Sequence, residues 1–354
     1  MDDSQSNKQS LNQIFGASWI TQGVWVAAEL GIADLLVNGP LTVEELAEKT
    51  QTHSAALYRV LRALASVGIF AQDSQGCFSL TPTANLLRSD VVDSQRYFAI
   101  MMGAEFHQAW GELLHSVQTG NGGFQKRFGV HFFQYMLDHP MRHGIYDAAM
   151  GAFGRAEAEA MLSAYDFSLF RTVVDVGGGS GMLLEAMLKR HPEIQGILFD
   201  LLAVVERARP LISDSGLSDR CRIEGGDFFS SVPAGADAYI LQHILHDWED
   251  NDAIAILGNC RKAMRSDSRV LLAELVIPPG NGPFFRTPPG GYRARAMSRR
   301  WERGGLSGPV EEAQNPGGCC LDRLYFGVRA GRLSRICATI GGADNLPLCD
   351  PVKG

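Results

Sequence analysis

Apolar side chains recur at helical spacing along the first part of the chain. Between Leu11 and Val37 they fall every three or four residues over several turns, which predicts a long amphipathic helix. The stretch 91–170 has a similar helical pattern that is rich in Phe, Met, His and Trp. These aromatic residues could line a substrate pocket, or they could simply pack a helical core. The first 170 residues are therefore predicted to be mainly helical.

A smaller unit is predicted between these helical stretches. Thr42 followed by Glu45 matches a capping box at the start of a helix. A second helix has its expected cap near Thr52, and two short apolar segments then flank the polar turn 73–76 and predict a β-hairpin. Helix, helix and hairpin together predict a winged helix, with helices over 43–49 and 52–68 and strands over 69–71 and 77–80.

The pattern changes near residue 173, where short apolar runs begin to alternate with helical segments. Such alternation predicts an α/β fold with a mostly parallel sheet covered on both faces and with ligands at the carboxyl ends of its strands. We predict strands over 173–176, 196–200, 222–229, 238–244 and 269–277, and a helix over 253–264.

A glycine-rich segment, VVDVGGGSG, joins the first of these strands to a helix. Glycines at 177, 179 and 181 allow a tight turn that exposes backbone N–H groups to a ligand at a helix N-terminus. The dinucleotide fingerprint requires a small residue at position 182, where this chain has Met182. Asp175 beside the turn would repel a pyrophosphate but would suit a cosubstrate with an ammonium or sulfonium charge. We therefore predict an S-adenosylmethionine site that includes Asp175, Gly177, Gly179 and Gly181; a simple tight turn is the alternative.

Acidic residues follow the next two predicted strands. Asp200 ends the second strand, where a carboxylate can accept both hydroxyls of a ribose. Asp227 and Phe228 end the third strand and could meet an adenine with a hydrogen-bond acceptor and an aromatic edge. The alternatives are a helix N-cap for Asp200 and a turn-forming role for Asp227.

His246 follows the fourth strand in the segment QHILHDWED. An imidazole beside the cosubstrate site can take the proton of a hydroxyl that attacks a methyl group. Because a phenol has a pKa near 10 and imidazole near 6.5, complete proton transfer before reaction would cost about 5 kcal/mol. A carboxylate that orients the ring would help, and Glu274 and Asp247 are the candidates. His243 competes with His246 for the role of base, but we expect it to lie inside the strand.

Composition narrows the classes of protein that fit. The net charge of −7 argues against a general nucleic-acid binder, and the expected recognition helix of the winged helix carries Arg59 and Arg62 as its only cations. We therefore expect this unit to join two subunits rather than to read DNA. No apolar run is long enough to span a membrane, the N-terminus does not resemble a signal peptide, and the seven cysteines lack zinc-site spacing. We expect a cytoplasmic homodimer without a metal.

These motifs together resemble the dimeric S-adenosylmethionine-dependent O-methyltransferases of the caffeate, hydroxyindole and bacterial phenazine and polyketide type. The resemblance runs from about residue 11 to 285 and rests on VVDVGGGSG, GGDFF, LHDWED, AELVIP and the N-terminal segments GVWVAAELGIADLL and LYRVLRALASVGIF. It implies a Rossmann-like methyltransferase sheet and an N-terminal dimerisation domain. It also implies that His246 is the base and Glu274 its neighbour, and that Gly177, Asp200, Asp227 and Phe228 bind the cosubstrate. Plant members often have a cosubstrate-binding lysine where this chain has Gln242.

The resemblance ends after residue 285. Gly and Pro supply 18 of the last 69 residues but 36 of the first 285, and the tail carries 11 Lys and Arg against 6 Asp and Glu. The family continues with a GGRERT segment, a second catalytic-site glutamate and an antiparallel hairpin that completes the sheet. Our hypothesis is a reading-frame shift near codon 285, after which the sheet lacks that hairpin; a genuine but divergent basic tail is the alternative.

The sequence thus predicts an O-methyltransferase that acts on a hydroxyl of a small aromatic secondary metabolite. A non-methylating hydroxylase or decarboxylase on the same fold and an inactive binding protein or winged-helix regulator are the alternatives. The predicted domains are a dimerisation domain over 1–90, a helical linker and substrate-lining segment over 91–170, a catalytic domain over 171–285 and an atypical tail over 286–354.

Overall fold

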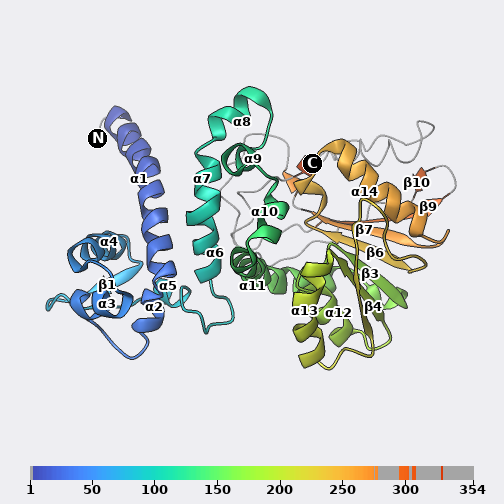
Figure 1. Ribbon diagram of the computed structural model, residues 1–354, viewed down its shortest axis with the longest axis horizontal. Coiled ribbons are helices and arrows are strands. Elements are labelled where there is room, and N and C mark those ends of the chain that lie inside the picture. The colour runs from blue at the N-terminus through green and yellow to red at the C-terminus, as the bar shows by residue number, and fades with distance from the viewer. Residues whose placement is uncertain (1–2, 275, 278–294, 303–304, 308–327, 330–354) are drawn as a thin grey trace. The chain divides into compact units, whose positions relative to one another are not determined.

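The computed structural model describes residues 3–274, 276–277, 295–302, 305–307 and 328–329. The chain divides into two compact units, 1–153 and 154–354 (Figure 1). The boundaries predicted for the four domains stay predictions.

The first unit begins with a long helix. α1 (Asp3–Glu29) ends two residues before Gly31, whose φ of 66° cannot continue a helix, and α2 (Ile32–Leu35) follows. The helical pattern that we predicted over 11–37 is therefore two helices rather than one. Large apolar side chains on α1 remain between 53% and 77% exposed, which marks this helix as a surface that needs a partner. They belong to Leu11, Ile14, Phe15 and Trp19.

Two helices and a hairpin follow, as predicted. Thr42 accepts a hydrogen bond from the backbone of Glu45 and the Glu45 side chain accepts one from the backbone of Thr42, so the capping box is present. The next helix is capped by His53 without a side-chain hydrogen bond; Thr52, the expected cap, instead lies with its hydroxyl 2.9 Å from that of Thr50. The elements are α3 (Val43–Thr50), α4 (Ser54–Ser66), β1 (Phe70–Gln72), β2 (Phe78–Leu80) and α5 (Pro82–Asn85).

The rest of this unit is helical, and its aromatic side chains pack on one another. The ring of Phe132 lies 5.3 Å from that of Phe106, 5.2 Å from that of Phe124 and 5.1 Å from that of Tyr146, distances typical of aromatic pairs. The elements are α6 (Arg96–Met101), a π-helix (Met102–Phe106), α7 (His107–Trp110), α8 (Leu113–Thr119), α9 (Gly123–Phe128), α10 (Phe132–Asp138) and α11 (Pro140–Ala164), which extends into the second unit.

The second unit is the predicted α/β domain. Its sheet has the order β10-β9-β7-β6-β3-β4-β5, in which β3 to β7 are parallel. α12 and α13 pack on one face and α14 on the other, each through buried aliphatic side chains (Figure 1). The elements are a 3₁₀ turn (Phe167–Leu169), β3 (Thr172–Val176), α12 (Met182–Arg190), β4 (Gln195–Asp200), α13 (Leu202–Asp214), β5 (Cys221–Gly225), β6 (Ala238–Gln242), a 3₁₀ turn (Leu245–Asp247), α14 (Asp250–Ala263), β7 (Arg269–Glu274), β8 (Val276–Ile277), β9 (Arg295–Glu302), β10 (Gly305–Ser307) and β11 (Val328–Arg329).

Two strands end earlier than predicted, and both changes affect the site. β5 stops at Gly225, so Asp227 lies in the following turn. β6 stops at Gln242, so His243 lies outside the strand and our expectation for it was wrong. The physical reason is the left-handed backbone of His243, whose φ of 55° is incompatible with a strand.

The outer edge of β7 differs from our expectation. We expected this edge to lack an antiparallel hairpin, but β9 pairs antiparallel with β7, and β10 pairs antiparallel with β9. Strand pairing uses backbone groups, so an edge can be covered by a segment whose side chains do not match the family pattern. Apart from β11, the other tail residues on which the reading-frame hypothesis bears lie outside the described residues.

Candidate functional site

The glycine turn lies between β3 and α12, where the strand order of the sheet reverses. Gly177 and Gly179 have φ of 73° and 55°, and Gly181 caps α12 with φ of 81°. The N–H of Gly177 donates to the carbonyl of Phe199 on the adjacent β4 at 2.8 Å, which fixes the turn to the sheet. A reversal of strand order opens a crevice at the carboxyl ends of the strands, the usual ligand site in such sheets.

Asp200 connects this turn to the end of β4. Its Oδ2 accepts the N–H of Gly179 at 2.9 Å, and its Oδ1 accepts the N–H of Leu201 at 2.7 Å. The helix that follows has Leu201 as its N-cap and no side-chain cap hydrogen bond, so Asp200 is not an N-cap of the ordinary kind. Its carboxylate therefore belongs to the glycine turn.

The turn has open space on one side and acidic side chains beside it. A Cβ added to Gly179 would meet nothing within 4 Å, so open space lies beside the Asp200 carboxylate. Asp175 is 2% exposed, and its Oδ2 has no hydrogen-bond partner among the described residues. Burial, with a further contribution from the charge of Asp200, raises the pKa of Asp175 to about 7. Two carboxyl groups near an open turn favour a cationic ligand.

Asp227 and Phe228 lie in the loop after β5. Oδ1 of Asp227 accepts the N–H of Phe229 at 2.8 Å, so the turn-forming role that we considered is present. The Phe228 ring meets Trp248 edge to face at 5.8 Å, and a Cβ added to Gly177 would lie 3.6 Å from that ring. Phe228 is thus next to the glycine turn, whereas the Asp227 side chain has a local structural role.

His246 lies in the 3₁₀ turn that follows β6, where Glu274 from the end of β7 fixes its ring. Nδ1 of His246 lies 2.7 Å from Oε2 of Glu274. The other oxygen, Oε1, accepts the backbone N–H groups of Ile244 at 3.1 Å and Leu245 at 2.7 Å. The Glu274 side chain is 1% exposed and that of His246 is 12% exposed. A buried carboxylate therefore orients the imidazole. Because a carboxylate can only accept a hydrogen bond, Nδ1 of His246 carries the proton when the ring is neutral.

Asp247 lies on the other side of the same ring. Its Oδ1 is 3.5 Å from Nε2 of His246, and its side chain is 28% exposed, so solvent weakens this pair. Burial acts to lower the pKa of His246, but the hydrogen bond to Glu274 and the charges of Asp247 and Glu274 together raise it above the ordinary 6.5. Of the two carboxylates predicted to orient His246, Glu274 makes the hydrogen bond.

The sequence did not indicate a second imidazole–carboxylate pair beside the first. Glu157 on α11 lies with its Oε2 2.8 Å from Nε2 of His243, and the same oxygen accepts the Gln242 side-chain N–H at 3.1 Å. The rings of His243 and His246 are 5.3 Å apart. Glu157 is more than eighty residues from this loop in sequence, and no local pattern in the surrounding helix distinguishes it from the neighbouring acids.

These residues include a group of the types that bind metals. His243, His246 and Glu274 each offer an atom within 4.8 Å of the other two. Each imidazole already lies within 2.8 Å of a carboxylate oxygen, so these side chains are engaged in hydrogen bonds with one another and with Glu157.

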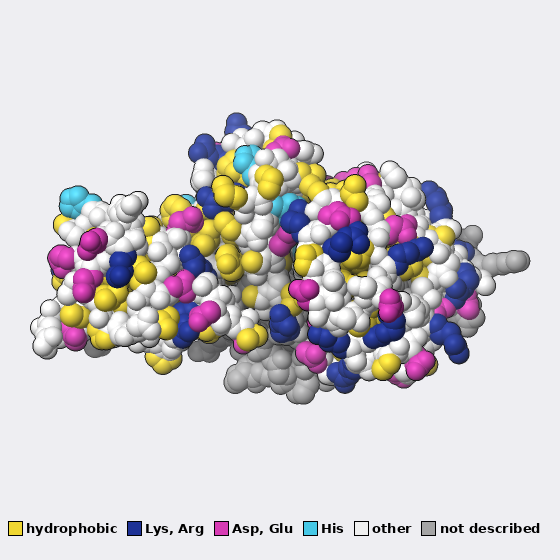
Figure 2. Space-filling model, turned by 60° about the horizontal axis from the view of Figure 1, so that its bottom comes forward, with side chains coloured by type: hydrophobic (Ala, Val, Ile, Leu, Met, Phe, Trp, Pro, Cys, Tyr) yellow, Lys and Arg dark blue, Asp and Glu magenta, His cyan; other side chains and the backbone are white. Residues whose placement is uncertain are grey.

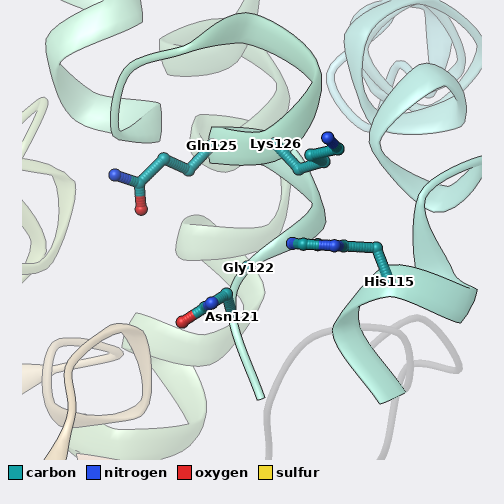
Figure 3. A pocket seen from close by; sticks show the side chains of 5 residues that line it. All are labelled: His115, Asn121, Gly122, Gln125 and Lys126. Atoms are coloured by element: carbon teal, nitrogen blue, oxygen red, sulfur yellow. The ribbon is translucent and has the colours of Figure 1, made fainter. Parts of the chain in front are cut away.

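A separate pocket lies in the first unit. It has a volume of about 280 Å³ and is lined by His115, Asn121, Gly122, Gln125 and Lys126. His115 comes from α8, and Gln125 and Lys126 come from α9 (Figure 3). The pocket contains none of the residues predicted for the cosubstrate site.

The described surface gives two further observations. On the face drawn in Figure 2, cationic and anionic side chains are intermixed rather than gathered into one basic field. None of the helices within the described residues has the length and apolar character needed to cross a bilayer.

Comparison with known families gives two matches along the chain. A model of the O-methyltransferase domain matches residues 110–286, and a model of the O-methyltransferase dimerisation domain matches residues 12–90. The first match ends where the sequence pattern breaks.

Individual relatives agree with these matches. A phenazine O-methyltransferase of Lysobacter antibioticus is 47% identical over 275 residues, which cover 78% of this chain and 81% of the relative. The crystal structure of LaPhzM aligns with a TM-score of 0.76 at 46% identity, covering 78% of this chain and 84% of that one. The structure of an O-methyltransferase of neocarzinostatin biosynthesis, in complex with S-adenosylmethionine and 2-hydroxy-5-methyl naphthoic acid, aligns with a TM-score of 0.68 at 36% identity. The alignment covers 72% of this chain and 79% of that one.

Proposed function

This chain belongs to the S-adenosylmethionine-dependent O-methyltransferases of secondary metabolism, and we propose that it methylates a hydroxyl of a small aromatic compound with His246 as the general base. The observation that carries the proposal is the hydrogen bond of 2.7 Å between His246 and the buried Glu274 at the carboxyl end of the sheet. The ring is fixed at Nδ1, and Nε2, which lies 3.5 Å from the partly exposed Asp247, would accept the proton of the acceptor hydroxyl.

His246 would receive the hydroxyl proton at Nε2 while its Nδ1–H stays hydrogen-bonded to Glu274. The backbone N–H groups of Ile244 and Leu245 hold Glu274 in place, so the carboxylate need not reorient when the ring becomes charged. Since a phenol is a much weaker acid than imidazolium, prior ionisation would cost about 5 kcal/mol. Proton removal concerted with attack avoids that intermediate.

The glycine turn supports the proposed cosubstrate site. S-adenosylmethionine supplies an electrophilic methyl group on a positively charged sulfur. Asp200 would accept hydrogen bonds from the ribose, Asp175 would add negative charge beneath the turn, and Phe228 would contact the adenine. Gly177, Gly179 and Gly181 let the ligand approach the backbone, and Gln242 borders the same crevice. Asp227, whose Oδ1 accepts the N–H of Phe229, would offer its second carboxylate oxygen to the adenine.

The acceptor is proposed from the relatives. They include a phenazine O-methyltransferase and an O-methyltransferase in complex with a hydroxylated naphthoic acid, and both compounds are aromatic. These relatives support a phenolic hydroxyl on a fused or substituted ring.

We also propose that the enzyme is a homodimer. The dimerisation-domain match and the exposed apolar side chains of α1 both support this assembly. Three interpretations stay predictions. They are the name winged helix for the unit of two helices and a hairpin, the exclusion of nucleic acid as a partner, and the cytoplasmic location.

A transfer assay tests the proposed function. The full chain is incubated with methyl-labelled S-adenosylmethionine and a panel of phenolic acceptors, and label in the product is counted. We expect labelled ether product from at least one phenol and its loss in His246→Ala, while calorimetry shows unchanged cosubstrate binding. Unlabelled hydroxylated or decarboxylated product would instead favour the non-methylating alternative, and parental transfer by His246→Ala would contradict the assigned base.

A further inference from the structure

We propose that Glu157 keeps His243 protonated, and that the resulting positive charge holds the neighbouring His246 in the neutral form that can accept a proton. This inference rests on the proposed role of His246 as the base. It gives His243 a positioning role, because His243 acts through His246.

The backbone of His243 is the first observation. Two non-glycine residues in the described part of the chain have a positive φ, Gln51 and His243. Gln51 is the C-cap of α3, where the left-handed conformation is common. His243 is at no helix end, and its N–H donates to the carbonyl of Ala273 on β7 at 2.9 Å. Residues held in sparsely populated backbone conformations cluster at active sites, so this conformation motivates a search for a role.

The partner of His243 is the second observation. Glu157 accepts from Nε2 of His243 and from the Gln242 amide with one oxygen. The Glu157 side chain is 19% exposed and that of His243 is 35% exposed, so solvent screens the pair only in part. A carboxylate at 2.8 Å favours the charged form of an imidazole over the neutral form.

The third observation is the position of this charge relative to the base. A cation 5.3 Å from the His246 ring disfavours a second positive charge there. Burial lowers the pKa of His246, but the hydrogen bond to Glu274 and the charges of Asp247 and Glu274 outweigh it and favour protonation. Because a protonated ring cannot act as a base, a further opposing charge helps to keep the ring neutral. His243 acts in the opposite direction and lowers the pKa of His246.

Among the described residues, the charged groups around His246 come from four elements. Glu274 lies at the end of β7, Asp247 in the same 3₁₀ turn, His243 in the loop after β6, and Glu157 on α11 behind His243. Three are acids, and His243 is the group among these four that can carry a positive charge. Removing that charge should therefore make His246 easier to protonate.

Imidazole titration by NMR tests the inference without requiring turnover. The full chain contains nine histidines and is labelled with ¹⁵N-histidine; the signals of His246 and His243 are assigned from the spectra of His246→Gln and His243→Asn. Asparagine tolerates the left-handed conformation, so His243→Asn removes the imidazole while keeping the backbone. Glu157→Gln keeps a hydrogen-bond acceptor but removes the charge.

We expect the titration midpoint of His246 to move to higher pH in both Glu157→Gln and His243→Asn. In transfer assays we expect Glu157→Gln to lose activity about 3- to 10-fold at pH 6 and less than about 2-fold at pH 9 relative to the parent. Glu159→Gln is the matched control, because Glu159 lies on the same helix with its side chain 65% exposed, and it should leave the midpoint unchanged.

An unchanged or lower His246 midpoint in Glu157→Gln would overturn the inference. That result differs from failure of the proposed function, in which His246→Gln keeps parental transfer whatever the titration shows. A loss of activity in Glu157→Gln that is equal at pH 6 and pH 9 would also count against the inference, since it would indicate a merely structural effect.

Discussion

Glu274 bonds with one oxygen to Nδ1 of His246 at 2.7 Å and with the other to two backbone N–H groups of the loop that carries this histidine. The carboxylate therefore fixes both the ring and the backbone on which the ring is mounted. Few side chains could replace it, because the site requires two acceptor atoms in one plane.

Glu274→Gln should lower kcat by about 100-fold or more. The amide oxygen can still accept the loop N–H groups, so its NH₂ must face Nδ1 of His246 and donate to it. The neutral ring then carries its proton on Nε2 and cannot take one from the acceptor hydroxyl. Steady-state kinetics measure the loss. Glu249→Gln, at an exposed residue just after the same loop, is the control; a kcat within threefold of the parent for Glu274→Gln would contradict this role.

The pH dependence of turnover follows from the charge state of His246. Its pKa is raised above the ordinary 6.5, and the neutral ring is the active form. Activity should therefore fall as the pH drops through a midpoint above 6.5 and should approach a plateau at alkaline pH. A kcat profile between pH 5.5 and 9.5, with the fold checked by circular dichroism at each end, measures it. A flat profile would rule out His246 as the titrating base.

Asp175→Asn should stabilise the protein at pH 8 more than at pH 5. The pKa of Asp175 is raised from 3.8 to about 7 in the folded state, so the folded state retains a proton that the unfolded chain has lost. Stability from this group is present at low pH and declines as the pH rises toward 7, by up to about 1.4 kcal/mol per pH unit. Asparagine stays neutral and avoids that loss.

Denaturant unfolding of the unliganded protein at pH 5 and pH 8 measures the difference. Asp219→Asn, at an exposed position of the same unit, should give equal effects at both pH values. Equal effects for Asp175→Asn would show that the carboxyl is ionised throughout this range.

Gly179→Ala should weaken S-adenosylmethionine binding about tenfold or more, with a modest loss of stability. The new methyl group has no protein atom within 4 Å and would fill the space beside Asp200. The left-handed backbone adds about 1–2 kcal/mol of strain. Gly177→Ala, whose Cβ would lie 2.5 Å from Cδ1 of Ile244, should destabilise the fold more. Calorimetry measures the change in cosubstrate affinity, and thermal unfolding measures the change in stability. Undiminished affinity in Gly179→Ala would show that the cosubstrate does not bind at this turn.

Resequencing of the gene should reveal a reading-frame shift near codon 285. The composition changes there, and the family match ends at residue 286. An independent clone sequenced across codons 280–290 is the measurement, and the restored frame should encode a segment resembling GGRERT. An uninterrupted frame in that clone would show that the basic tail is genuine.

Local signals predicted much of this fold. The Thr42–Glu45 capping box and the spacing of apolar residues are properties of neighbouring residues: the first predicted the start of α3, and the second predicted helix at the N-terminus but not its break at Gly31. The alternation of strands and helices likewise predicted the mostly parallel sheet with helices on both faces, whereas the order of its strands comes from the structure.

Features that depend on distant contacts were not predictable in this way. The apolar pattern around His243 is typical of a strand and does not indicate the left-handed conformation that this residue adopts. Its partner Glu157 is more than eighty residues away in sequence, so the pairing depends on how the chain folds. The hairpin on β7 was also missed, because backbone pairing leaves no side-chain pattern in the tail. Asp227, by contrast, makes the local turn hydrogen bond that we gave as its alternative role, and its cosubstrate contact stays a prediction.

The close approach of Gly177 and Ile244 has a consequence for protein engineering. The glycine turn and the loop that carries His246 touch at these two residues with no space for a single additional carbon. Trimming Ile244 to a smaller residue would open room on the cosubstrate side while leaving the imidazole and its carboxylate intact. Position 244 is thus a natural starting point for libraries that aim to accept bulkier sulfonium donors.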